Sequence, residues 1–179
     1  MKNKTTEILF AGFGGQGIMF MGKLMAQAGL SMNKYVTWMP AYGAEVRGGT
    51  AYSVTKISDR EIANPIISNP DILVVMNEPS LVKYAGRLKA KGVLIMNSSM
   101  IGIKPPRKDI KIVSIPMTET ASKLGNVRSA NMIAIGAIIK CSKIFPLKII
   151  TAALRDMVGD KEDLYQLNKK AMEKGFQKG

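Results

Sequence analysis

Histidine is missing from the 179-residue sequence, and cysteine occurs once, as Cys141. An iron–sulfur cluster requires about four cysteine ligands, and zinc sites draw most of their ligands from cysteine and histidine. A Ser-His or Cys-His nucleophile pair requires an imidazole. Metal, cluster and triad chemistry carried by this chain alone is therefore close to excluded. Because Cys141 lies in the apolar run "AIGAIIKCSKIF", we interpret it as a core residue rather than a reactive thiol.

Long apolar runs are also missing. The longest are "DILVVM", "GVLIM" and "MIAIGAII", which are too short to span a bilayer. The first residues, "MKNKTTEILFAG", lack the apolar core and cleavage site of a signal peptide. We therefore expect a cytoplasmic protein that does not associate with membranes. Apolar residues make up 46% of the chain, which predicts one folded domain over residues 1–179.

Basic residues outnumber acidic ones by 26 to 13, which gives a net charge of +13. A basic surface attracts phosphate groups of nucleic acids, nucleotides or coenzyme A, and also acidic proteins. The other interpretation is that these lysines solvate the exposed faces of helices. The five phenylalanines and five tyrosines form no recognisable base-stacking platform, so we expect no nucleic-acid partner.

Apolar strands alternate with helical patterns along the chain. Strands are predicted at 7–11, 34–39, 50–58, 71–77, 93–97 and 109–116, with the segment 50–58 toward an edge of the sheet. Helices are predicted at 15–30, 80–92 and 118–125, in the run from 130, and over a C-terminal region of about 146–178. This order predicts a three-layer α/β/α fold with a largely parallel, Rossmann-like sheet.

The glycine-rich stretch "GFGGQG", residues 12–17, joins the first strand to the first helix and fits the pattern G-x-G-x-x-G. Ligands of open α/β sheets lie beyond the carboxyl ends of the strands, and N–H groups at a helix start favour an anion. The acidic residue that should close the second strand is missing, since Pro40 follows that strand and the first carboxylate is Glu45. A bound anion or partner backbone, a dinucleotide, and a tight turn needed only for packing all stay open.

Three further side chains belong to the same edge. Arg47 precedes Gly48 and Gly49, and a guanidinium in such a loop suits a carboxylate or phosphate, or else pairs with Glu45 on the surface. Gln16 offers an amide to a ligand or solvates the loop tip. Asn77 ends a buried strand. The candidate cofactor-binding residues are Gly14, Gly15, Gln16, Gly17, Arg47 and Asn77, with no catalytic or metal-binding residue among them.

Three segments taken together resemble the gamma subunits of the 2-oxoacid:ferredoxin oxidoreductases. They are "GFGGQGIMFMGKLMAQAG", "VTWMPAYGAEVRGGTAYSVTKIS" and "NPDILVVMNEPSL", and the resemblance covers roughly residues 6–140. The form "TWMPAYGAEVRGGTAY" is most similar to the 2-oxoglutarate branch, also called 2-oxoglutarate synthase. Ala41 and Ala44 stand where the family often has serine and proline, so this loop is less stiff than usual.

The resemblance implies the gamma domain of pyruvate:ferredoxin oxidoreductase as the fold and a non-autonomous enzyme subunit as the function. The complete enzyme would oxidatively decarboxylate a 2-oxoacid with coenzyme A to give acyl-CoA, CO2 and reduced ferredoxin. Thiamine diphosphate and iron–sulfur clusters would belong to alpha and beta subunits, with a ferredoxin-like delta subunit in some members. This chain would bind no cofactor alone and would border coenzyme A at a subunit interface. The alternative is a stand-alone Rossmann-like module that binds a nucleotide or anion.

Overall fold

The computed structural model describes residues 4–41 and 50–179. In this part of the chain, six strands form one sheet in the order β2-β3-β1-β4-β5-β6. The strands are β1 (Thr5–Gly12), β2 (Tyr35–Ala41), β3 (Ala51–Ser58), β4 (Ile72–Val75), β5 (Val93–Asn97) and β6 (Lys111–Ile115). The α-helices are α1 (Ile18–Ser31), α2 (Glu78–Tyr84), α3 (Met117–Lys123), α4 (Ala130–Ser142), α5 (Leu147–Val158) and α6 (Glu162–Lys178). Two short 3-10 helices, η1 (Ala85–Arg87) and η2 (Val127–Ser129), follow α2 and α3.

Five strands run in one direction and β3 runs against them. Strands β1, β4, β5 and β6 pair in parallel, whereas β3 pairs antiparallel with both β1 and β2. Residues 50–58 lie toward an edge of the sheet, as predicted, although β2 is the edge strand itself and β3 pairs with a strand on each side. The serine and threonine side chains of β3 are buried. Ser53 Oγ and Thr55 Oγ1 donate to the carbonyls of Ile18 and Gly22 in α1, at 3.0 and 3.1 Å.

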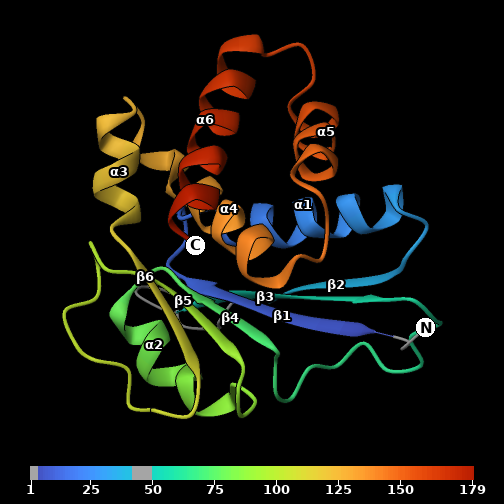
Figure 1. The fold of residues 1–179 in the computed structure, drawn as a ribbon, viewed down its shortest axis with the longest axis vertical. Helices are drawn as coiled ribbons and strands as arrows, with labels where there is room; N and C mark the ends of the chain where they lie inside the picture. Colours follow the sequence, from blue (N-terminus) through green and yellow to red (C-terminus); the bar gives the residue numbers. More distant parts are fainter. Residues whose placement is uncertain (1–3, 42–49) are drawn as a thin grey trace.

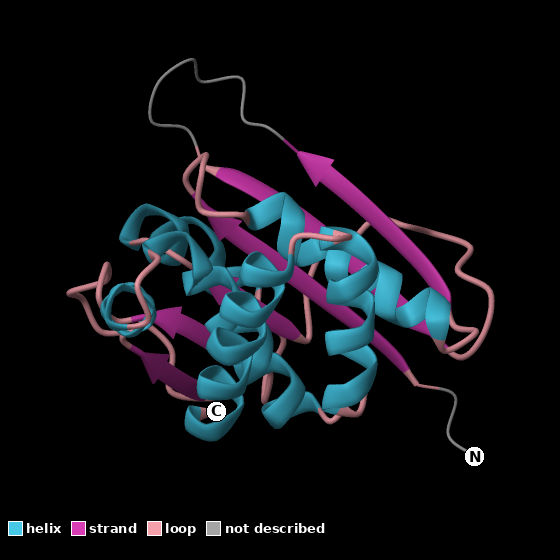
Figure 2. Ribbon diagram, turned by 90° about the horizontal axis from the view of Figure 1, so that it is seen from above, coloured by secondary structure: helices cyan, strands magenta, loops and turns pink. Residues whose placement is uncertain are grey.

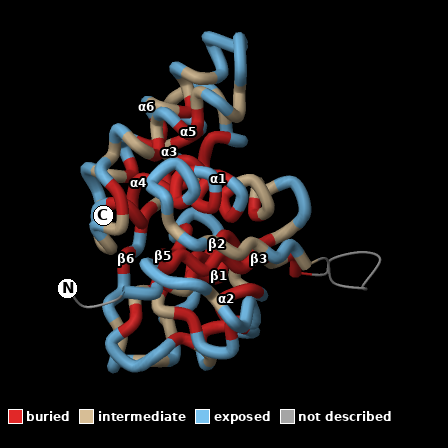
Figure 3. Tube along the Cα trace, turned by 90° about the vertical axis from the view of Figure 1, so that its right-hand side faces the viewer, coloured by how far each residue is buried: buried red, intermediate tan, exposed pale blue. Residues whose placement is uncertain are grey.

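Helices cover both faces of the sheet, as a three-layer fold requires. Figure 1 shows α1, α4, α5 and α6 above the sheet and α2 below it. Viewed from above in Figure 2, the upper helices lie across the strands. Because side chains alternate along a strand, Ile8 and Phe10 of β1 enter the upper core while Leu9 and Ala11 enter the lower one. The buried segments in Figure 3 gather in the strands and in the helices against them.

The upper layer is two helices deep because α4 is apolar all round. Every residue of α4 from Ala130 to Ile139 is buried between the sheet and the outer helices. Helices α5 and α6 lie within the C-terminal helical region expected at about 146–178. Among the described residues, no helix is long and apolar enough to cross a membrane.

The helix predicted over 80–92 is shorter than expected. Helix α2 ends at Tyr84, and η1 continues it only to Arg87. Leu88 adopts an extended backbone with ψ near 134°, which turns the chain back and leaves its side chain 2% exposed in the lower core. Burial of this leucine therefore outweighs the helical propensity of the lysine-rich segment after it.

Candidate functional site: the glycine rim

The glycine loop between β1 and α1 has an open part and a packed part. Gly15 and Gly17 have φ angles of +88° and +73°, which side chains rarely adopt. A Cβ added at Gly14 or Gly15 would meet nothing within 4 Å. A Cβ at Gly12 would lie 2.6 Å from Gln16 Oε1, and one at Gly17 would lie 2.1 Å from Asn131 Nδ2. The first and last glycines of the motif therefore serve packing, while Gly14 and Gly15 leave backbone accessible.

Helix α1 begins without the side chains that usually cap a helix. Gly17 occupies the cap position, no described side chain bonds to the first turn, and that turn contains no acidic residue. We call the glycine loop, residues 12–17, together with Asn77 after β4, the glycine rim. The first N–H groups of this 14-residue helix lie at the rim and carry a partial positive charge, which favours an anion.

Gln16 makes hydrogen bonds that neither sequence interpretation anticipated. Its Oε1 accepts hydrogen bonds from the backbone N–H of Phe13 at 2.7 Å and from Nδ2 of Asn77 at 3.2 Å. Its Nε2 donates to the carbonyl of Met76 at 3.3 Å. The side chain thus ties the glycine loop to the carboxyl end of β4, and it fixes the shape of the loop.

Asn77 lies beside Gln16, as its position after a buried strand predicted. Its side chain is fully buried, and Oδ1 accepts from the N–H of Ser80 at 3.0 Å, which caps α2. With Nδ2 directed to Gln16, the carboxamide joins the start of α2 to the glycine loop. Of the remaining candidates, Gly14, Gly15 and Gly17 lie with Gln16 in one loop, and Arg47 lies outside the described residues.

A small pocket of about 180 Å³ opens beside the loop, and sequence reasoning did not identify most of its walls. We call it the rim pocket; its lining includes Gly15, Gln16, Met76, Met100, Thr118 and Arg128. Arg128 is exposed and brings a cation to this wall from η2, more than 100 positions along the chain. No local pattern marks this arginine, because only the packing of η2 against α3, α4 and α6 brings it there.

Asn97 at the end of β5 binds the start of the following helix, as Asn77 does after β4. It is fully buried, its Oδ1 accepts from the N–H of Met117 at 3.0 Å, and its Nδ2 donates to Thr118 Oγ1 at 2.8 Å. The stretch "NSS" at 97–99, where a buried strand ends, was the sequence signal that could have identified Asn97. Asn97 thereby holds the start of α3 against the rim.

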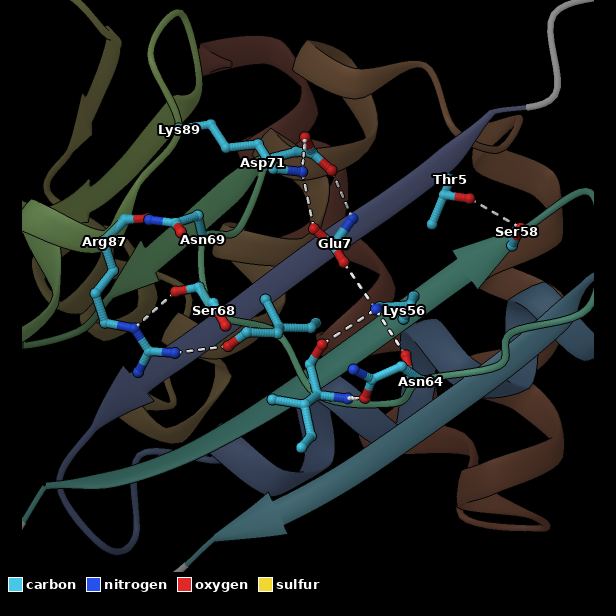
Figure 4. Close-up of polar contacts among 12 residues, drawn as sticks. Thr5, Glu7, Lys56, Ser58, Asn64, Ser68, Asn69, Asp71, Arg87 and Lys89 are labelled. Atoms are coloured by element: carbon cyan, nitrogen blue, oxygen red, sulfur yellow. Dashed lines mark hydrogen bonds and ion pairs between the residues drawn. The ribbon is translucent and has the colours of Figure 1, made fainter.

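A network of charges lies at the opposite end of the sheet and supports the fold (Figure 4). Lys56 Nζ lies 2.8 Å from Glu7 Oε1 and donates to the carbonyls of Asn64 and Ile66 at 2.8 and 3.1 Å. Lys89 bridges Glu7 and Asp71 at 2.8 Å to each. Burial raises the pKa of Glu7, but hydrogen bonds and charges of the two lysines outweigh it and hold the pKa below its ordinary value. The network pins the segment after β3 beneath the sheet.

Metal ligands do not converge in the described part of the chain. Within residues 4–41 and 50–179, no group of three or more histidine, cysteine, aspartate or glutamate side chains could hold a metal ion. The single cysteine of the sequence does not fit an iron–sulfur cluster. The groups at the rim are suited to binding rather than to catalysis. They are backbone N–H groups, the guanidinium of Arg128 and a pocket lined by both polar and apolar residues.

The fold and the glycine loop together define a Rossmann-like α/β domain with a largely parallel sheet. Residues 7–178 match the family model described as pyruvate ferredoxin/flavodoxin oxidoreductase, and the chain belongs to this family. It is 35% identical over 160 residues to the 2-oxoglutarate synthase subunit KorC of Methanothermobacter thermautotrophicus, covering 85% of this chain and 84% of that subunit. It is also 30% identical over 173 residues, 96% of its length, to the ketoisovalerate oxidoreductase subunit VorA of Methanothermobacter marburgensis. The chain spans only 36% of VorA, about a third.

Solved structures give the same relationship. The gamma subunit of a keto/oxoacid ferredoxin oxidoreductase from Geobacter sulfurreducens has a TM-score of 0.85 and 30% identity, with 97% of each chain covered. A 2-oxoglutarate:ferredoxin oxidoreductase from Magnetococcus marinus, with 2-oxoglutarate, coenzyme A and succinyl-CoA bound, has a TM-score of 0.88 and 25% identity. That match covers 97% of this chain and 31% of the other. The resemblance to gamma subunits and the expected fold are thus confirmed, and these relatives are parts of enzymes.

Proposed function

We propose that the chain is the gamma subunit of a multisubunit 2-oxoacid:ferredoxin oxidoreductase that acts on 2-oxoglutarate. The complete enzyme would decarboxylate the 2-oxoacid, transfer the acyl group to coenzyme A and pass the electrons to ferredoxin. The observation that carries this proposal is the match to KorC, a subunit of nearly the same extent. The sequence form of residues 37–52, "TWMPAYGAEVRGGTAY", supports the same branch.

The redox chemistry belongs to partner subunits in this proposal. A chain with one cysteine and no histidine has too few ligands for a cluster. Thiamine diphosphate would supply the decarboxylation, and the clusters would carry the electrons, in alpha, beta and ferredoxin-like delta subunits. This chain would contribute binding surface and shape.

Its own contribution would be to border the channel for coenzyme A. Coenzyme A carries several phosphate charges, which suit the uncapped N–H groups of α1 and the guanidinium groups of Arg128 and Arg47. The open backbone at Gly14 and Gly15 lets a ligand or partner chain approach closely. Gln16 and Asn77 would act by holding this loop in place, since their polar atoms bond to one another and to backbone.

Replacing Arg47 by alanine in the reconstituted complex tests the channel. We expect the KM for coenzyme A to rise about tenfold because one charge-assisted phosphate contact is lost, with kcat nearly unchanged. Arg60, an exposed arginine after β3 at the opposite end of the sheet, offers the matched control Arg60→Ala. An unchanged KM together with unchanged subunit assembly would remove Arg47 from the site.

Purification from the host distinguishes the proposal from the stand-alone nucleotide- or anion-binding module. A gamma subunit should copurify with larger subunits, and the complex should oxidise 2-oxoglutarate in preference to pyruvate or ketoisovalerate. A preference for ketoisovalerate would move the chain to the branch of VorA. A lone chain that holds NAD(H), FAD or coenzyme A tightly would favour the module instead.

A further inference from the structure

Strand β2 forms an open edge of the sheet. In the described part of the chain it pairs only with β3, and Figure 2 shows it as the outermost strand on its side. Its seven residues, Tyr35–Ala41, include no charged side chain, although a lysine or another charge commonly protects such an edge. A row of open N–H and C=O groups without this protection is a template for a further strand.

Pro40 determines which backbone groups of β2 face outward. A proline has no N–H to donate to β3, so within a sheet its nitrogen faces the open side. Because backbone orientation alternates along a strand, the N–H and C=O groups of Val36 and Trp38 also face outward. Within residues 4–41 and 50–179, no turn or loop bonds to the backbone of Val36 or Trp38. These two residues therefore have backbone groups to offer to another strand.

The side chains of β2 divide between the two faces of the sheet. Val36 and Trp38 pack on α1, since Cβ atoms added to two glycines of that helix would lie 2.7 and 2.6 Å from them. Tyr35, Thr37 and Met39 therefore belong to the lower face. Tyr35 and Met39 are 52% and 42% exposed. Between them, Thr37 Oγ1 is buried and has no hydrogen-bond partner among the described residues.

Antiparallel pairing of β2 with a second copy of itself fits the backbone when Thr37 lies on the two-fold axis. Val36 then lies opposite Trp38 of the second copy, and because both face outward they exchange N–H···O bonds. Pro40 lies opposite Lys34, whose N–H is already bonded within the turn before β2, so the pairing ends there on both sides. A register centred on Trp38 would instead place Val36 opposite Pro40, which has no N–H to give.

The same register matches the side chains of the lower face. Tyr35 lies opposite Met39 of the second copy, so the exposed apolar side chains cover one another, and a methionine sulfur against an aromatic ring is a favourable contact. The two Thr37 side chains meet at the axis in a non-hydrogen-bonded backbone pair, where side chains are closest and threonines bond to one another. Thr37 Oγ1 thereby gains the partner that it lacks within the described residues.

We infer that the edge strand β2 is a docking surface for a second copy of this chain, paired antiparallel about a two-fold axis at Thr37. One sheet then continues through both copies. A strand of another protein would find the same backbone groups, but the match of Tyr35 to Met39 and of Thr37 to itself requires a copy. The inference is independent of the proposed function, since it involves no ligand.

Sedimentation equilibrium of the complete chain over a range of concentrations tests the pairing. We expect a reversible monomer–dimer equilibrium. Met39→Lys should raise the dissociation constant about tenfold, because a charge replaces the apolar contact with Tyr35. Ile112→Lys is the matched control, since Ile112 is also 42% exposed but lies on β6, the other edge strand. It adds the same charge and should change the dissociation constant by less than about twofold.

Cysteine cross-linking tests the register. Cys141→Ser removes the only cysteine and provides the background. In it, Thr37→Cys should form a disulfide-linked dimer on mild oxidation, because a non-hydrogen-bonded pair brings the two Cα atoms to about 4.5 Å, within disulfide range. Tyr35→Cys and Met39→Cys should each fail to cross-link alone and should cross-link when the two variants are mixed.

Salt distinguishes a second copy from an acidic partner at the same edge. Each copy carries a net charge of +13, so two copies repel, and salt that screens this repulsion should lower the dissociation constant. A chain that remains monomeric throughout, a dimer that salt dissociates, or equal weakening by Met39→Lys and Ile112→Lys would overturn the pairing. Cross-linking of Tyr35→Cys to itself in place of Thr37→Cys would overturn the register. Circular dichroism of each variant guards against a folding effect.

Discussion

Gln16 shows how a single side chain can fix the shape of a glycine loop. Its three hydrogen bonds join residues 13, 76 and 77, so they tie the glycine loop to the end of β4. Glycine loops gain conformational freedom from their composition, and such freedom must be limited if the loop is to present its N–H groups in fixed directions. The cross-link supplies this limit.

Replacing Gln16 by alanine should therefore loosen the rim. We expect the free energy of unfolding to fall by about 1–3 kcal/mol, because the partly buried partners lose their bonds. In the proposed oxidoreductase complex, the KM for coenzyme A should rise. Urea unfolding and steady-state kinetics measure the two effects. Gln166→Ala is the control, since among the described residues the Gln166 side chain bonds only to exposed Glu162; an equal loss in both variants would contradict the cross-link.

Glu7 carries a prediction about pH. Because its pKa is lowered in the folded chain, ionised Glu7 stabilises the fold above its unfolded pKa of about 4.3, and this stabilisation is lost as pH falls through the folded value. Glu7→Gln should reduce stability at pH 7, and the difference from the native chain should shrink between about pH 5 and pH 3.

Urea unfolding at several pH values measures this difference. Glu119→Gln is the matched control, since Glu119 pairs with Lys123 on the exposed face of α3 and such pairs contribute little. A difference between Glu7→Gln and the native chain that stays constant over this pH range would contradict the role given to the network.

At the scale of elements, the contact between α4 and α6 depends on glycine. A Cβ on Gly136 would lie 1.9 Å from the carbonyl oxygen of Met172, and one on Gly175 would lie 1.9 Å from that of Ile133. The two helices therefore touch backbone to backbone, which lets α6 bury Ala171 and Met172 against α4.

Gly136→Ala should destabilise the chain although alanine favours helices. Overpacking against a backbone atom costs about 1–3 kcal/mol, more than the gain of about 1 kcal/mol from propensity. Gly86→Ala is the control, because a Cβ there would meet nothing within 4 Å. Thermal unfolding compares the two, and a stabilised Gly136→Ala variant would show that α6 can shift outward at no cost.

Strand β3 shows where sequence patterns mislead at this scale. Its serine and threonine residues are typical of a strand with one wet face, yet Ser53 and Thr55 are buried and donate to α1. The pattern could not distinguish water from helix carbonyls as hydrogen-bond acceptors, because both satisfy a hydroxyl. The strand and its place toward an edge of the sheet were predicted, while its antiparallel pairing with β1 and β2 was not.

At the scale of the whole molecule, the prediction of one domain over residues 1–179 leads to a single unfolding transition. The upper core joins β1, β4, α1 and the C-terminal helices in one cluster. Trp38 is the only tryptophan and packs against Gly22 of α1. Its fluorescence and the far-ultraviolet circular dichroism of the helices should therefore change at the same urea concentration. If the circular dichroism signal changed at a lower urea concentration than the fluorescence, α5 and α6 would form a separate unit.

The sequence by itself determined the alternation of strands and helices, the glycine loop at the first strand-to-helix junction and the lack of ligands for a metal cluster. These features follow from local periodicity and from residue counts, which need no knowledge of distant contacts. The family was also recognisable, because three motifs kept their order and spacing.

Only the tertiary structure decided how the rim is built. It joined Gln16 to Asn77 and brought Arg128 to the pocket beside the glycine loop. These pairs are separated by tens to more than a hundred positions in the chain. These residues are brought together by the burial of α4 and the sheet. The free energy of this burial is summed over the whole core, and no local sequence pattern contains it.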